Sequence, residues 1–287
     1  MNEDIQRINL EDYFQTGEGG TALTYNHKNG KTLAKLFMPG FAAETAIREF
    51  GVNQVVYESG LPTPKPIRLI TDGTRVGAEY ELVPNKRSFT RIISQQPDQL
   101  VPLSQRFAKL ARRIHETPAD TQRLPNMNEM VRRGIERFEK LPDSYKQRFF
   151  RFLDTVPVQT TCLHGDLHIG NIITDGERDL WIDVGDFAYG VPEWDLCMMY
   201  YSSNFMSAER CDQIFHLTPD MLKAHWAAFA PAYYGTDSQE VLEAEIRKLC
   251  PYAATKVAFL VCKLHDGKGA PSEALMGMFD RMLPENG

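Results

Sequence analysis

Residues 163–171 read Leu-His-Gly-Asp-Leu-His-Ile-Gly-Asn, and Asp183 follows twelve residues after the last of them. The stretch offers a carboxylate at Asp166 and a carboxamide at Asn171, and Asp183 adds a second carboxylate at the end of an apolar run. Such oxygen atoms are the ligands that Mg²⁺ prefers in proteins. Short β-branched and apolar runs on either side of Asp175-Gly176 predict a hairpin, which would bring Asn171 and Asp183 together.

The spacing reproduces the catalytic-loop pattern of kinases, in which His-x-Asp is followed by four residues and Asn, with a further Asp downstream. In that pattern the first Asp orients an attacking hydroxyl group, and the Asn and the later Asp hold Mg²⁺ against the phosphates. Asp166 is therefore the candidate catalytic residue, and Asn171 and Asp183 are the candidate metal ligands. Asp186 is the alternative to Asp183 as a metal ligand; otherwise it is an additional contact of the metal ion or supports the residues that bind it. His164 is expected to fix the loop by hydrogen bonds.

A different assignment of the same loop would make it a transition-metal site. His164, Asp166 and His168 supply imidazole and carboxylate groups, which suit zinc or iron. This assignment leaves Asn171 and Asp183 without a role, so the phosphate chemistry is favoured.

A glycine-rich turn is predicted near the N-terminus. Gly17, Gly19, Gly20 and Thr21 lie between two short strand-like runs. Residues without side chains let backbone N–H groups approach phosphate oxygens closely. The turn departs from the full kinase loop because Ala22 stands where the third spaced glycine would be. We expect these four residues to contact a nucleotide.

Lys35 is predicted to lie inside a strand, with its side chain on the face opposite its apolar neighbours. The expected role of its ammonium group is to bridge two phosphate oxygens. A glutamate from the helix predicted over residues 41–57 would steady it, and Glu49 is favoured over Glu44 because it borders the apolar face of that helix.

The chain is expected to divide into a strand-rich part, residues 1–83, and a helix-rich part, residues 84–287. Asn29-Gly30 predicts a two-residue hairpin turn in the first part. Apolar periodicity and breaker residues predict further strands at 65–70 and 75–83, and helices at 100–114, 127–141, 143–154, 193–206, 209–216, 219–230, 238–249, 252–264 and 272–283.

Composition favours an ordinary globular protein. The net charge of −6 argues against a nucleic-acid partner. The 5 cysteines form no CxxC pair, so neither disulfides nor a zinc site are expected. The first residues contain no apolar signal-peptide stretch, and no run approaches the ~18 apolar residues of a membrane span. No membrane association and a cytoplasmic location are therefore expected.

Three segments together resemble the aminoglycoside phosphotransferase family. They are the stretch from His164 to Ile173, Trp181-Ile182-Asp183-Val184-Gly185-Asp186, and Gly190-Val191-Pro192-Glu193-Trp194-Asp195-Leu196. The resemblance implies an α+β, bilobal protein-kinase-like fold. Its small N-terminal lobe would bind the nucleotide with an antiparallel sheet and one helix, and its larger helical lobe would carry the catalytic loop and the acceptor pocket.

The resemblance also implies functional roles. Asp195 would brace the backbone of the catalytic loop, and Glu81 and Val83 would meet the base of ATP at the hinge, with GTP as the alternative nucleotide. The implied activity is Mg²⁺-dependent phosphorylation of a hydroxyl group on an aminoglycoside-like compound, an amino-alcohol or a sugar, and a cationic acceptor is one option. An atypical protein kinase and a nucleotide-binding pseudokinase that acts as an interaction module are the alternatives.

Overall fold

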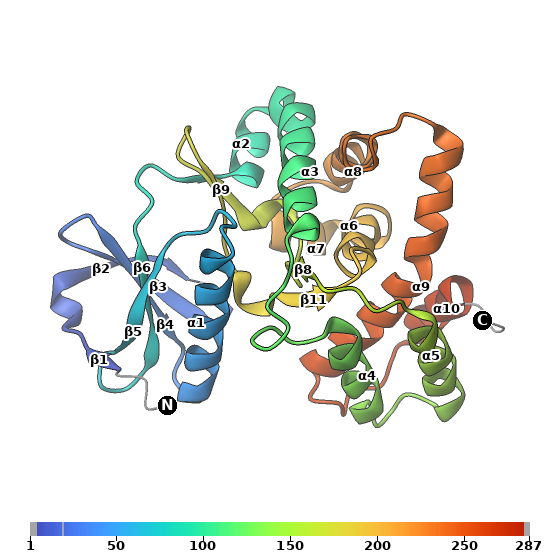
Figure 1. The fold of residues 1–287 in the computed structure, drawn as a ribbon, viewed down its shortest axis with the longest axis horizontal. Helices are drawn as coiled ribbons and strands as arrows, with labels where there is room; N and C mark the ends of the chain where they lie inside the picture. The colour runs from blue at the N-terminus through green and yellow to red at the C-terminus, as the bar shows by residue number, and fades with distance from the viewer. Residues whose placement is uncertain (1–4, 19, 284–287) are drawn as a thin grey trace. The chain divides into compact units, whose positions relative to one another are not determined.

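The structure is a computed structural model that describes residues 5–18 and 20–283. It contains two compact units (Figure 1). The first unit comprises the described residues up to Phe89 together with residues 171–187, and the second comprises residues 90–170 and the described residues from Ala188 onward. The chain passes from the second unit back to the first between Gly170 and Asn171, inside the motif of residues 163–171.

A six-stranded sheet forms most of the first unit. Its order is β1-β5-β6-β4-β3-β2, in which β1 pairs with β5 in parallel and every other pair is antiparallel. The predicted antiparallel sheet is therefore confirmed, with one parallel strand that was not predicted. The strands and short helices are β1 Gln6–Arg7, η1 Leu10–Asp12, β2 Tyr13–Glu18, β3 Ala22–His27, β4 Thr32–Phe37, β5 Pro66–Thr71 and β6 Val76–Glu81.

Strand alternation puts Lys35 on the face of the sheet that carries helix α1, Ala43–Glu58 (Figure 1). Ala34 and Leu36 are fully buried on the other face with Tyr13. This confirms the predicted direction of Lys35. The hairpin between β3 and β4 is also present, but four residues, 28–31, join the strands instead of the predicted two-residue turn.

The hairpin after Asn171 packs with the first unit. Strand β9, Ile172–Thr174, pairs with β10, Asp179–Trp181, and with β7, Arg87–Ser88. Val83 packs against apolar residues of this hairpin. The pairing and packing of this hairpin thus group it with the N-terminal strands. The boundary predicted after residue 83 had placed it in the second part.

The second unit is mainly helical. Side chains of Asn126, Ser207, Thr218, Ser238 and Ser272 cap the starts of α4, α7, α8, α9 and α10 by accepting backbone N–H groups. Helix α2 begins at Phe89 and η3 ends at Asn171, and both of these residues belong to the first unit. The elements are α2 Phe89–Gln95, η2 Pro97–Gln99, α3 Leu100–Glu116, α4 Met127–Arg137, α5 Asp143–Thr155, β8 Thr161–Leu163, η3 Ile169–Asn171, β11 Ala188–Gly190, α6 Glu193–Phe205, α7 Ala208–Phe215, α8 Pro219–Tyr234, α9 Gln239–Leu264 and α10 Glu273–Met282.

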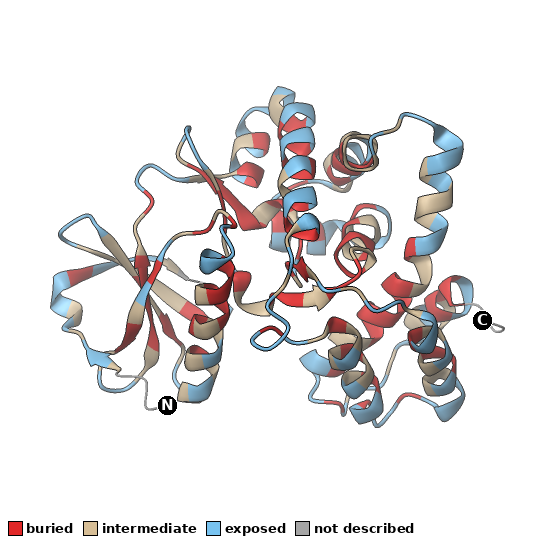
Figure 2. Ribbon diagram, in the orientation of Figure 1, coloured by how far each residue is buried: buried red, intermediate tan, exposed pale blue. Residues whose placement is uncertain are grey.

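Helix α9 continues through Pro251, so the prediction of two helices separated there is wrong. Proline removes one helical hydrogen bond and clashes with the preceding turn, at a cost of about 3 kcal/mol. The following turns, 252–258, are buried, and this burial offsets the cost. Figure 2 shows α9 pale blue and tan along its first half and mostly red beyond it. Among residues 5–18 and 20–283, no helix is long and apolar enough to cross a membrane.

His225 on α8 is a buried group whose titration should affect stability. Its Nδ1 lies 2.8 Å from Ser104 Oγ on α3, and burial lowers its pKa from 6.5 to about 3. The unfolded chain therefore binds a proton below pH 6.5 that the folded chain does not bind until about pH 3. Folding stability should fall as pH drops through this window, by about 2 kcal/mol from this histidine between pH 7.5 and pH 5.

Urea unfolding at the two pH values checks this expectation. His225→Asn keeps an N–H donor near Ser104 but cannot titrate, so its stability should depend less on pH than that of the wild type. His216→Asn, at an exposed position, is the matched control and should behave like the wild type. Equal pH dependence in His225→Asn and the wild type would refute the assignment.

Candidate active site

Lys35 lies between two carboxylates of the first unit. Its Nζ donates hydrogen bonds to Glu49 Oε1 at 2.9 Å and to Asp183 Oδ1 at 3.1 Å. Burial lowers the pKa of the ammonium group, but the charges of Asp183 and Glu49 outweigh burial and raise the pKa above its ordinary value. Lys35 therefore remains charged at neutral pH. Glu44, the alternative partner, is exposed in the first turn of α1.

Asp183 occupies an unusual backbone conformation at the end of the hairpin. Its φ of 53° and ψ of 44° are left-handed, a conformation that Asp and Asn tolerate better than most residues. Its side chain remains 58% exposed although it contacts Lys35. The next turn, η4 Val184–Asp186, passes close to α1, and a Cβ on Gly185 would lie 2.6 Å from Glu49 Cγ. The glycine therefore allows Glu49 to reach Lys35 beside Asp183.

Asn171 lies at the same end of the hairpin as Asp183. Its carbonyl oxygen accepts the N–H of Ile182 at 3.0 Å, which extends the β9–β10 ladder by one pair. The predicted hairpin is thus present, and it brings the backbone of Asn171 beside the residue that precedes Asp183. Asp186, the alternative ligand, lies in η4 and is half-buried.

The donor set of the first unit fits a hard divalent cation. Asp183 and Asn171 carry carboxylate and carboxamide oxygens, and Mg²⁺ at phosphate sites commonly takes only one or two protein carboxylates beside phosphate and water. Within the part of the chain that the structure describes, no group of three or more His, Cys, Asp and Glu side chains could hold a metal ion. His164, Asp166 and His168 therefore do not form the transition-metal site considered above.

The glycine-rich segment is only partly a turn. Gly17 lies inside β2, where it pairs with Thr24, so the predicted placement of Gly17 in the turn is wrong. Gly19 is outside the described residues. Gly20 and Thr21 are exposed in the segment between β2 and β3, and a Cβ on Gly20 would meet no atom within 4 Å. Two of the four predicted residues thus lie at an open turn.

The predicted hinge residues follow β6. The carboxylate of Glu81 accepts hydrogen bonds from both terminal nitrogens of Arg178 at 3.1 and 3.2 Å. Its backbone N–H donates to Lys65 O. Val83 is 4% exposed and packs with Ile173 and Leu180. A contact of Glu81 with a base through its side chain would therefore compete with Arg178.

Asp166 lies in the second unit on the loop after β8, with its side chain 60% exposed. His168 Nε2 is 3.6 Å from Asp166 Oδ2, which is an ion-pair distance and too long for a good hydrogen bond. Its crowded surroundings raise the pKa of Asp166, but His168, His164 and Lys256 outweigh this effect and hold the pKa below its ordinary value. The carboxylate is therefore ionised and accessible at neutral pH.

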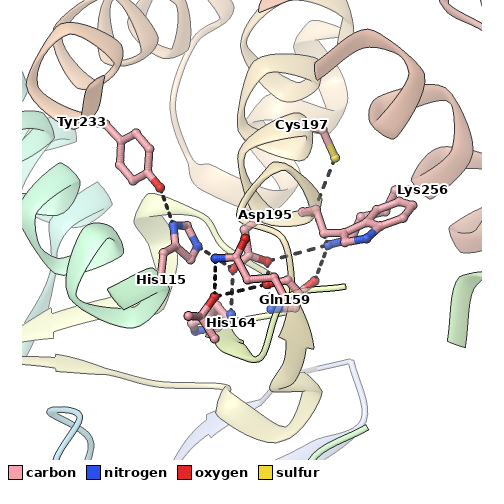
Figure 3. Close-up of polar contacts among 11 residues, drawn as sticks. His115, Gln159, His164, Asp195, Cys197, Tyr233 and Lys256 are labelled. Carbon is pink, nitrogen blue, oxygen red and sulfur yellow. Dashed lines mark hydrogen bonds and ion pairs between the residues drawn. The ribbon is translucent and has the colours of Figure 1, made fainter. Parts of the chain in front are cut away.

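Asp195 on α6 holds the backbone of this loop. Its Oδ2 accepts the N–H of His164 at 2.7 Å, and its Oδ1 accepts the N–H of Gly165 at 3.0 Å. His115 Nε2 lies 3.1 Å from Oδ2, and Tyr233 OH lies 2.7 Å from His115 Nδ1 (Figure 3). Burial raises the pKa of Asp195, but the hydrogen bond with His115 and the charges of Lys256, His115 and His164 outweigh burial, so the net shift is downward. The brace implied by the resemblance is present.

Sequence reasoning missed Lys256, a buried residue of α9 that contacts the same loop. Its Nζ donates to Gly165 O at 2.8 Å and to Trp194 O at 2.7 Å. The available signal was a lysine directly before the apolar run Val257–Cys262, with Ala253, Ala254 and Thr255 on its other side. A charged residue beside such a run is rarely buried unless it is paired.

Comparison with known proteins identifies the family. The model of the phosphotransferase enzyme family (APH) matches residues 17–235, about three quarters of the chain. Among curated proteins, none matches this sequence significantly.

Solved structures share the fold at low sequence identity. An aminoglycoside phosphotransferase APH(4)-Ia mutant, in a ternary complex with AMP-PNP and hygromycin B, is 11% identical, with 96% of this chain and 94% of that chain covered and a TM-score of 0.63. A choline/ethanolamine kinase family protein from Mesorhizobium loti is 15% identical, with 94% and 86% covered and a TM-score of 0.57. Amicoumacin kinase hAmiN, in complex with AMP-PNP, Ca²⁺ and Ami, is 14% identical, with 97% and 88% covered and a TM-score of 0.56.

The family match and the shared fold agree with the chemistry of Lys35, Asp183 and the Asp166 loop. The predicted α+β, protein-kinase-like fold is thereby confirmed. This chain belongs to the phosphotransferase enzyme family and, as its motif resemblance to aminoglycoside phosphotransferases predicted, is a kinase-type phosphotransferase.

Proposed function

We propose that this phosphotransferase moves the γ-phosphoryl group of ATP to a hydroxyl group of a small molecule in a Mg²⁺-dependent reaction. The observation that carries the proposal is the pairing of Lys35 with both Glu49 and Asp183 in the first unit. A fixed ammonium group beside an exposed carboxylate suits the phosphates and the cation of a metal–nucleotide complex. ATP is the nucleotide to test first, with GTP as the alternative.

Asp166 supplies the group that acts on the acceptor. Its carboxylate is ionised because its pKa lies below the ordinary value, and its exposure leaves it open to a hydroxyl group. Phosphoryl transfer has a loose transition state, so a carboxylate that accepts the hydroxyl hydrogen bond mainly orients the attacking oxygen. As the new P–O bond forms, the bond between the γ-phosphorus and the ADP oxygen breaks, ADP leaves, and the hydroxyl proton passes to Asp166.

Asn171 and Asp183 are the residues that would hold Mg²⁺, with Asp186 as an additional contact. The cation, when bound, supplies positive charge that offsets the charge of the phosphate oxygens. Lys35 contributes a second, permanent positive charge, and Glu49 keeps its ammonium group in place. Gly20 and Thr21 offer backbone N–H groups at an open turn.

The proposed acceptor class rests on the solved relatives. Their names refer to choline or ethanolamine, to amicoumacin and to an aminoglycoside phosphotransferase with bound hygromycin B. Amino-alcohols and amino-sugars are therefore the first compounds to test, and neutral sugars follow. The net charge of −6 is compatible with a cationic acceptor.

An acceptor panel tests the proposal. The purified chain is incubated with ATP and Mg²⁺ and with amino-sugars, amino-alcohols, neutral sugars and peptides, and mass spectrometry detects the addition of one phosphate. We expect one small-molecule class to be phosphorylated, with ADP release at least about tenfold above the rate without acceptor. Phosphorylation of peptides alone would support a protein kinase instead. Nucleotide binding without transfer to any compound would support the interaction module.

A further inference from the structure

Lys256 is a buried ammonium group that contacts the backbone of the catalytic loop. It is 2% exposed on α9. Its Nζ donates to Gly165 O and Trp194 O, and it lies 3.9 Å from Asp195 Oδ1 (Figure 3). An ammonium group has three donors and no acceptor, so the two carbonyls take two of its hydrogen bonds. The carboxylate of Asp195 is at an ion-pair distance and too far for a hydrogen bond.

Asp195 and Lys256 fix successive groups of the same short backbone segment. Asp195 accepts the N–H groups of His164 and Gly165, whereas Lys256 donates to the carbonyl of Gly165. Gly165 has a φ of 82°, which side chains disfavour. Its carbonyl belongs to the planar peptide bond that leads into Asp166. The direction of that carbonyl therefore fixes the plane of this peptide bond, and with it the direction in which the Asp166 side chain leaves the backbone.

Burial of a lysine at this position is costly. A buried ion pair can often be replaced by apolar residues of similar volume with no loss of stability, so such a pair is weak evidence for a purely stabilising role. Ala253, Ala254 and Val257, which lie near Lys256 in α9, are buried and apolar. A methionine could fill this space, but it could not bind the Gly165 carbonyl.

We infer that Lys256 is a positioning residue for phosphoryl transfer, because it holds the Gly165 carbonyl and thereby the orientation of Asp166. The inference rests on the proposed function, since it takes Asp166 as the group that orients the acceptor. Lys256 acts through the backbone of the loop and touches neither nucleotide nor acceptor in this role.

Lys256→Met is the central test variant. It keeps a long unbranched side chain, and the Trp194 carbonyl keeps its contact with Cys197 Sγ at 3.4 Å. The Gly165 carbonyl loses its hydrogen bond with Lys256, and Asp195 loses an ion pair but keeps His115 and two backbone N–H groups. We expect kcat to fall about 10–100-fold, because small misplacements of a reacting group cost on this order. KM for the metal–nucleotide complex should stay within about twofold, since the nucleotide residues belong to the first unit.

Two further variants separate positioning from folding. Lys256→Gln retains N–H donors and should lose less activity than Lys256→Met. Lys263→Met changes an exposed lysine of the same helix and should leave kcat unchanged. If kcat of Lys256→Met falls only in proportion to the folded fraction, or if both Lys256 variants match the wild type, the inference is overturned.

Amide hydrogen exchange of residues 163–167 tests the contact without any turnover. Exchange should be about tenfold faster or more in Lys256→Met than in the wild type and Lys263→Met. If the wild type phosphorylates no acceptor, the proposed function fails, and the exchange rates still decide the loop contact by themselves. Equal exchange in all three proteins would overturn it.

Discussion

Asp166→Asn is expected to lower kcat by about 10²–10⁴-fold while nucleotide affinity stays within about twofold. Asparagine keeps the size of the side chain but loses the negative charge that accepts the acceptor's hydrogen bond and takes up its proton. The side chain is 60% exposed, so the change should leave the fold intact. Initial-rate kinetics with the acceptor found in the panel, together with calorimetric titration of the nucleotide, measure the two effects separately.

Asp154→Asn is the control for this substitution. Asp154 is also an exposed carboxylate of the second unit, and its partner Arg132 is a half-buried residue of α4. Its loss should change kcat by less than about twofold, because exposed ion pairs contribute little. A kcat of Asp166→Asn within about threefold of the wild type would refute the role of Asp166.

Asp183→Asn is expected to weaken binding of the metal–nucleotide complex by about 10–100-fold or more. Loss of a residue that only supports the metal ligands typically costs this much in metal affinity, so loss of a ligand should cost at least as much. Asparagine suits the left-handed backbone of this residue, so the hairpin should keep its conformation. The loss would come from the missing carboxylate charge, both toward Mg²⁺ and toward Lys35. Calorimetric titration with ATP, with and without Mg²⁺, measures it.

Asp186→Asn provides the matched control, because this residue lies in the adjacent turn and is the alternative ligand. We expect Asp186→Asn to weaken nucleotide binding less than Asp183→Asn does, because Asp186 is proposed only as an additional contact of the cation. A larger loss in Asp186→Asn than in Asp183→Asn would transfer the ligand role to Asp186 and contradict the assignment made from the hairpin.

The proposed catalytic loop could be recognised in the sequence because the types and spacing of its residues match those that phosphoryl transfer requires. Lys35 could be placed because strand alternation fixes the face of a side chain, and Glu49 because helical spacing puts it beside the buried face of α1. These are local rules. They were sufficient for the fold class and for most of the strands and helices, but strands β1, β7, β8 and β11 and helix α2 were not predicted.

Features that depend on distant parts of the chain could not be predicted in the same way. Pro251 normally breaks a helix, but burial of the following turns keeps α9 continuous. Gly17 was assigned to a turn because no local signal distinguishes a strand glycine beside Thr24 from a loop glycine. Lys256 contacts Gly165 across a long sequence separation, and only the packing of α9 reveals it.

Calorimetric titration of the wild-type protein with ATP in the presence of Mg²⁺ tests the central claim most directly. The arrangement of Lys35, Glu49 and Asp183 predicts one nucleotide bound per chain, with affinity that drops when Mg²⁺ is removed. If neither ATP nor GTP binds with Mg²⁺ at millimolar concentration, well above the ~1 μM–1 mM range usual for enzyme substrates, the account of this site as a nucleotide-dependent phosphotransferase is contradicted.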